Sequence, residues 1–116
     1  MNIGGKLSKN EEVSKPKSTD LAVKVPSILL DLIPQYLANR RNEVGLLSNA
    51  VDSEDFSIIQ NIGHKLKGNA GSYGFSKLTE LGSILEKAGQ QKDLNLAKKS
   101  IAEYSSYLAD VYVVPE

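Results

Sequence analysis

The sequence contains no cysteine and no tryptophan, and it has a single histidine. Without cysteine the chain cannot form disulfides or perform thiol chemistry, which is compatible with the reducing cytoplasm, where we expect the protein. One histidine and no cysteine fall short of the three or four ligands that a zinc site needs. We therefore expect a core built mainly from aliphatic side chains and a chain that binds no metal or other cofactor.

The chain also lacks an excess of either charge and lacks a long apolar run. Lysine plus arginine and aspartate plus glutamate both number 14, whereas nucleic-acid-binding domains usually carry a basic excess. No segment approaches the ~18 apolar residues of a membrane span, and the N-terminus, MNIGGKLSKN, lacks the apolar centre of a signal peptide. These features predict a single small domain, a monomer, with no nucleic-acid or membrane partner.

Composition divides the chain into two parts. Residues 1–22 are rich in lysine, acidic residues and serine and contain Pro16, so we expect a flexible polar tail. Residues 23–116 hold the amphipathic segments and should form the folded domain.

Apolar residues recur at helical spacing in four segments, which predicts four helices with inward-facing stripes. The stripes are Leu37, Val44, Leu47 and Val51; Phe56, Ile59, Gly63, Leu66, Ala70 and Tyr73; Leu78, Leu81, Leu85 and Ala88; and Leu94, Ala97, Ile101, Tyr104, Leu108 and Val111. Short connections favour antiparallel neighbours. The fold predicted is all-α: an antiparallel up-down four-helix bundle, with a short extra N-terminal helix that Pro26 opens.

Local signals suggest where the helices begin and end. We expect Ser76 and Asp93 to cap the third and fourth bundle helices, and Gly89 to end the third. The terminal VYVV, residues 111–114, has strand propensity but continues the apolar stripe, so we assign it to the last helix. Arg40 and Arg41 interrupt the first stripe; either one arginine lays its stem on the core with its head in solvent, or it contacts a partner at the rim. We favour the first interpretation.

The single histidine lies in the stretch QNIGHKLKGNAGSYGF, residues 60–75. On the predicted helix His64 falls off the apolar stripe and should point outward. Lys67 and Gly68, three and four residues on, share its face. A mid-helix glycine costs roughly 1 kcal/mol relative to alanine, so we expect Gly68 to have a steric purpose.

This stretch resembles the signature of the histidine phosphotransfer (HPt) domains of two-component phosphorelays: His, any residue, Leu, Lys, Gly, small residues, Gly and an apolar residue. The matching positions are His64, Leu66, Lys67, Gly68, Ala70, Gly71, Ser72, Gly74 and Phe75. The resemblance extends over about residues 25 to 112. It implies that exposed His64 accepts a phosphoryl group, with Lys67 and Gly68 completing the site and Gln60 and Gly71 in support.

The chemistry fits that implication. Neutral imidazole, whose ordinary pKa is about 6.5, is a good nucleophile, and phosphoryl transfer mainly needs positioning and charge neutralisation. Lys67 can neutralise phosphoryl oxygens, and Gly71 serves either docking or helix packing. In the HPt domains of chemotaxis histidine kinases, a glutamate at the position matching Glu86 hydrogen-bonds the histidine ring; the alternative is a surface glutamate paired with a lysine.

The resemblance implies a phosphocarrier rather than an enzyme, because these 116 residues contain no ATP-binding segment. Its partners would be response regulator receiver domains and a sensor or hybrid histidine kinase, with Mg²⁺ on the receiver. Two alternatives remain: the phosphotransfer domain of a chemotaxis-type kinase, and a helical interaction module that carries no phosphate.

Overall fold

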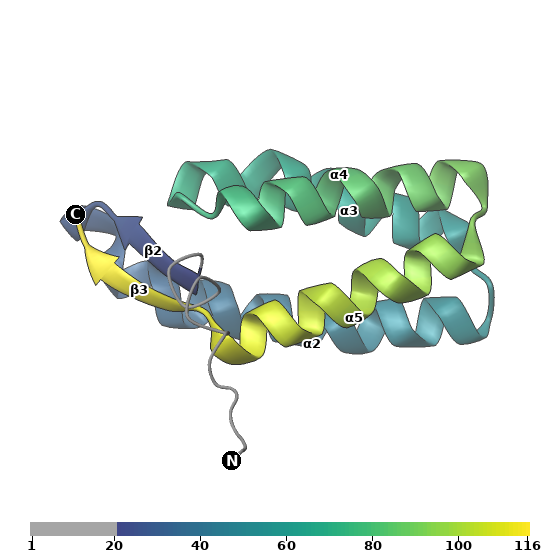
Figure 1. Ribbon diagram of the computed structural model, residues 1–116, viewed down its shortest axis with the longest axis horizontal. Helices are drawn as coiled ribbons and strands as arrows, with labels where there is room; N and C mark the ends of the chain where they lie inside the picture. The colour runs from purple at the N-terminus through teal and green to yellow at the C-terminus, as the bar shows by residue number, and fades with distance from the viewer. Residues whose placement is uncertain (1–20) are drawn as a thin grey trace, which may run out of the picture.

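The computed structural model of the chain describes residues 21–116, which form four α-helices and a two-stranded ladder (Figure 1). The helices are α2 (Ile33–Asp52), α3 (Phe56–Ala70), α4 (Ser76–Gln91) and α5 (Leu94–Asp110). Figure 1 shows α3 and α4 side by side along one edge and α2 and α5 along the other. The predicted predominantly helical class is confirmed, whereas the predicted tail lies almost wholly outside the described residues.

The core is aliphatic with a few aromatic rings, and all four helices contribute to it. Its largest fully buried side chains are Tyr104, Phe75, Leu47, Ile59, Leu66, Leu78, Leu81 and Leu85 from the helical region. The stripe predicted for the histidine helix is buried at its centre, from Ile59 to Ala70, and half-buried at its two ends, Phe56 and Tyr73. Burial of this stripe fixes the rotation of α3 and leaves the opposite face in solvent.

Aspartate side chains start two of the helices. Asp55 and Asp93 each accept a hydrogen bond from the backbone N–H three residues on, at 3.3 Å and 3.0 Å, at the N-termini of α3 and α5. The predicted cap at Ser76 is wrong, because Ser76 is already the first residue of α4. Phe75 occupies the N-cap position without a side-chain hydrogen bond, and its ring is fully buried, so core packing rather than capping locates this helix start.

The helix end predicted at Gly89 is also wrong. Helix α4 continues through Gln91, and Lys92 follows it in the left-handed conformation with φ 54° and ψ 40°. Gly89 lies inside the helix and is buried against Gln60 of α3. A glycine that permits close helix contact therefore stood where the sequence suggested a helix stop.

The C-terminal VYVV is not helical, which corrects the assignment made from its periodicity. Val111 adopts an extended conformation (φ −65°, ψ 143°) after α5, and strand β3 (Tyr112–Pro115) pairs in parallel with β2 (Ala22–Val25). The partner strand lies at the other end of the described residues, so local periodicity could not reveal the pairing. The predicted boundary between tail and domain, residues 22 and 23, falls inside β2.

A 3-10 helix, η1 (Ser27–Leu32), stands where the short extra N-terminal helix was expected. Pro26 occupies its N-cap position, and it runs directly into α2. Pro34 lies in the first turn of α2, where a missing N–H is harmless.

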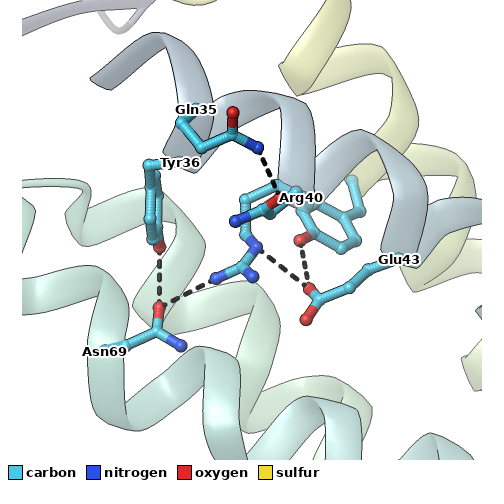
Figure 2. Close-up of polar contacts among 7 residues, drawn as sticks. Gln35, Tyr36, Arg40, Glu43 and Asn69 are labelled. Carbon is cyan, nitrogen blue, oxygen red and sulfur yellow. Dashed lines mark hydrogen bonds and ion pairs between the residues drawn. The ribbon is translucent and has the colours of Figure 1, made fainter. Parts of the chain in front are cut away.

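A largely buried polar cluster ties α2 to α3 and α5 (Figure 2). Arg40 Nε lies 3.2 Å from Glu43 Oε1, and their side chains are only 12% and 15% exposed. The Tyr104 hydroxyl donates to the same oxygen of Glu43 at 2.9 Å. On the α3 side, Asn69 Oδ1 accepts from the Tyr36 hydroxyl at 2.7 Å and from Arg40 Nη1 at 3.3 Å. The favoured interpretation, an arginine head in solvent, is therefore wrong for Arg40.

Tyr36 anchors the end of the histidine helix. Its ring stacks on Tyr73 with centroids 4.3 Å apart and on Phe75 at 5.6 Å, while the Arg40 guanidinium lies 4.7 Å above it. Burial raises the pKa of the Tyr36 hydroxyl, which keeps it protonated as a donor to Asn69. These contacts hold the C-terminal turn of α3 against α2.

Replacing Arg40 with alanine should strongly destabilise the fold. The substitution leaves the Glu43 carboxylate without its cation in a mostly buried place, and breaking such a pair typically costs roughly 3 kcal/mol or more. Arg41→Ala is the matched control, since Arg41 is exposed, and should change stability by less than about 0.5 kcal/mol. Urea denaturation followed by circular dichroism measures both. Equal losses for the two variants would contradict the structural role of the cluster.

Candidate functional site

His64 lies on the outward face of α3, at about the middle of the helix. Its side chain is 69% exposed, whereas Gly63, which precedes it, and Leu66, two residues on, are buried. The helix is held at both ends, by the Asp55 cap and by the contacts of Asn69. The fold thus presents an accessible imidazole from a fixed backbone.

Glu86 of α4 contacts the imidazole directly. His64 Nδ1 and Glu86 Oε2 are 2.7 Å apart. A carboxylate can only accept, so Nδ1 donates this hydrogen bond, and in a neutral ring the lone pair is then on Nε2. The contact suggested for Glu86 from the sequence is present in the structure, and it orients the ring with Nε2 as the available nucleophile.

Lys67 binds the other oxygen of the same carboxylate. Its Nζ lies 2.6 Å from Glu86 Oε1, with the lysine side chain 42% and the glutamate side chain 14% exposed. The Lys67 ammonium and, after it, the His64 ring hold the pKa of the Glu86 carboxyl below its ordinary 4.5. Both interpretations of Glu86 therefore apply together: it contacts the histidine and is also paired with a lysine.

The two exposed glycines near His64 are not required by packing within the described residues. A Cβ placed on Gly68 would meet no heavy atom within 4 Å, and one on Gly71 would meet only Thr79 Oγ1, at 3.7 Å. These distances favour the docking interpretation of Gly71 over helix packing. The role of Gly68 in giving a partner clearance stays a prediction.

The structure brings together His64, Lys67 and Glu86, but it places Gln60 differently. Gln60 is half-buried one turn before His64, with its backbone against Gly89 of α4. Among the described residues, no hydrogen bond joins it to the histidine. Gln60 belongs to the packing of the two helices that carry the site.

Sequence reasoning missed Gly82, which lies in the same helix contact. It is buried opposite the backbone of Lys67. The available signal was the spacing of Gly82 and Gly89, seven residues apart on the buried face of α4. Two glycines at that spacing on one helix face are typical of close backbone contact with a neighbour.

In residues 21–116, no three or more His, Cys, Asp or Glu side chains gather as a potential metal site. No helix in that range is long and apolar enough to cross a membrane. The site described is an open helical face that displays one imidazole with its carboxylate and ammonium.

Comparison with models of known protein families identifies the family of this chain. The model of the Hpt domain family matches residues 29–111, which include the site and all of the four α-helices but neither strand. The chain belongs to the Hpt domain family, whose members are phosphocarrier modules for histidine phosphotransfer in two-component signalling. No curated protein and no solved structure matches the chain significantly.

Removing the charge of Lys67 should raise the pKa of the Glu86 carboxyl. Because that pKa lies below 4.5 in the folded protein, the contacts favour folding at pH values above 4.5, and this contribution is lost as the pH falls through the lowered pKa. Carbon-13 NMR of the Glu86 carboxyl should give a midpoint below 4.5 in the wild type and a higher one in Lys67→Met. Lys65→Met, which removes an exposed neighbouring charge, should leave it in place. Identical midpoints in all three proteins would show that the ion pair does not form in solution.

Proposed function

We propose that this Hpt domain accepts a phosphoryl group on Nε2 of His64 from a receiver-domain aspartate, or from a kinase, and relays it to a response regulator receiver. The observation that carries the proposal is the hydrogen bond of 2.7 Å between His64 Nδ1 and Glu86 Oε2 on an exposed helix face. This bond leaves one ring nitrogen free, basic and accessible.

The transfer step uses only groups at this site and on the donor. The Nε2 lone pair attacks the phosphorus of the aspartyl phosphate; the N–P bond forms as the P–O bond breaks, and the aspartate leaves as a carboxylate. The proton stays on Nδ1, so the phosphorylated ring carries a positive charge next to Glu86, which stabilises it. The reverse step passes the group to the next aspartate.

Lys67 has two anionic partners within reach in this scheme. It pairs with Glu86 before transfer, and its position three residues after His64 lets its flexible side chain approach the phosphoryl oxygens afterwards. Charge neutralisation of those oxygens is what phosphoryl transfer most requires. The Mg²⁺ that such transfers use is expected on the receiver.

The proposal includes the finer features expected from the sequence. The domain acts as a monomeric carrier in an antiparallel up-down bundle and has no ATP-dependent kinase activity of its own, so a sensor or hybrid histidine kinase supplies the phosphoryl group. Contacts between α3 and α4 support opposite directions for that pair, since Gln60 meets Gly89 while Lys67 meets Gly82.

The His64–Glu86 bond also favours a second candidate. The HPt domains of chemotaxis histidine kinases have a glutamate in the matching position, and they receive the phosphoryl group directly from the ATP bound to a catalytic domain. In this alternative the chemistry at Nε2 is the same, but the donor is ATP rather than an aspartyl phosphate.

Replacing His64 with glutamine should abolish phosphorylation without unfolding the protein, because the side chain is exposed. The wild type, incubated with ³²P-labelled phosphorylated receiver domains, should take up label that is labile in acid and stable in base. A second arm with ATP and histidine kinase catalytic domains distinguishes the two donors. Undiminished label on His64→Gln would exclude His64 as the acceptor, and receiver binding without label on the wild type would favour the interaction module.

Gly68→Gln should stay folded and yet slow transfer from a receiver, because the added side chain occupies the space one turn from His64. Gly45→Gln is the matched control, since a Cβ on Gly45 of α2 also meets no heavy atom within 4 Å. Gly68→Ala should keep or raise the melting temperature, because replacing a mid-helix glycine can raise the free energy of unfolding by up to ~1 kcal/mol. Labelling by a small donor such as acetyl phosphate should suffer less than labelling by a receiver. Wild-type receiver kinetics for Gly68→Gln would refute the clearance role.

A further inference from the structure

Helices α3 and α4 meet with their backbones nearly in contact beside the site. A Cβ added to buried Gly63 would lie 2.8 Å from the carbonyl oxygen of Gly82 and 2.9 Å from Cα of Glu86, and closer still to the backbone nitrogen of Glu86. Carbon atoms in ordinary contact are about 3.5–4.0 Å apart. Position 63 therefore has no room for a side chain at the present helix separation.

Gly82 makes the reciprocal contact from α4. A Cβ there would lie 2.5 Å from the backbone nitrogen of Lys67 and 3.0 Å from its Cα. The two glycines thus lie against the backbones of Glu86 and Lys67, the two residues whose side chains form the ion pair, and Gly63 directly precedes His64. Two of the close backbone contacts between the helices therefore lie at the site.

The separation of the helices decides whether the carboxylate reaches the ring. The Nδ1–Oε2 distance is 2.7 Å, and hydrogen bonds weaken beyond about 3.2 Å. An alanine at position 63 would push α4 outward by ~1 Å to reach ordinary contact distances. This movement exceeds the difference between the Nδ1–Oε2 distance and the distance at which hydrogen bonds weaken. Lys67, with its long flexible stem, can follow the movement, whereas the short imidazole of His64 cannot.

We propose that Gly63 is a positioning residue that, with Gly82, sets the helix separation at which Glu86 holds the Nδ1–H tautomer of His64. Gly63 acts through Glu86 and does not touch the reacting atoms. The effect of this spacing on transfer rests on the function proposed above, but the tautomer itself can be observed without any phosphorylation.

The test is long-range ¹H–¹⁵N NMR of the His64 ring at a pH where the imidazole is neutral. The wild type should show mainly the Nδ1–H tautomer, and Gly63→Ala should lose that majority. In the Glu86→Gln background, Gly63→Ala should cause no further change, because its effect passes through the carboxylate. An unchanged Nδ1–H majority in folded Gly63→Ala, or a full additional change without Glu86, would overturn the proposal.

Gly89→Ala controls for lost stability. Its Cβ would lie 2.5 Å from the backbone nitrogen and 2.7 Å from Cα of Gln60, so it strains the same helix pair about one turn from Glu86. Its melting temperature should fall as in Gly63→Ala while the Nδ1–H majority is kept. Loss of the tautomer in both variants to the same degree would mean that general loosening, not Gly63, is responsible, and would overturn the proposal.

Glu86→Asp covers the case in which Gly63→Ala does not fold. It shortens the carboxylate arm by one methylene without touching the glycine contact, so it should also lose the Nδ1–H majority; retention would show that spacing does not matter. Phosphorylation of the wild type is scored separately. If Gly63→Ala loses the Nδ1–H majority but the wild type takes up no label, the proposed function alone is refuted. If the wild type takes up label but Gly63→Ala keeps the Nδ1–H majority, this inference alone is refuted.

Discussion

The close contact between α3 and α4 is the constraint on which the site depends. Helices of ordinary composition pack with axes about 8–10 Å apart because side chains separate their backbones. Here three glycines, Gly63, Gly82 and Gly89, remove those side chains along one line of contact. Each of them lowers intrinsic helix propensity, and the core leucines on both sides stabilise the pair despite that cost. A short carboxylate on one helix can then reach two residues of the other.

The shared carboxylate has consequences for the charge balance in the proposed transfer to His64. Glu86 neutralises Lys67 and accepts a hydrogen bond from Nδ1 of the His64 ring. After transfer the ring is cationic, so it binds the carboxylate more strongly than before. Lys67 can then leave Glu86 for the phosphoryl oxygens, because the cationic ring still neutralises the carboxylate. In the proposed mechanism the same three side chains thus provide for both the neutral and the phosphorylated ring.

Much of this arrangement was predictable because it depends on local periodicity. The burial of Ile59 and Leu66 fixes the exposure of His64, and the resemblance to the HPt domains of chemotaxis kinases directed attention to Glu86. The meeting of Glu86 with His64 depends on the rotation and spacing of two helices, which no single segment determines. Gly89 shows the ambiguity at its simplest, since glycine suits both a helix end and a close helix contact, and only the neighbouring helix decides between them.

Arg40 and the strands were misjudged for a related reason. The partners that keep the Arg40 head inside, Glu43 and Asn69, include one from another helix, and the partner of β3 lies at the opposite end of the described chain. Periodicity within a segment carries no information about such contacts, whereas it located much of the aliphatic core; Val44 and Val51, predicted to face inward, are half-buried.

The β2–β3 ladder has a consequence for the order of folding. Pairing Ala22 with Tyr112 closes a loop of about 90 residues, which costs roughly 4 kcal/mol in chain entropy if nothing else has formed. A ladder of four residue pairs cannot repay that cost alone, but the helices bring its two strands together as they pack. We therefore expect the strands to pair only once the helices have begun to pack. The mutual contacts of His64, Lys67 and Glu86 do not involve the ladder, because all three residues belong to the sequence-adjacent helices α3 and α4.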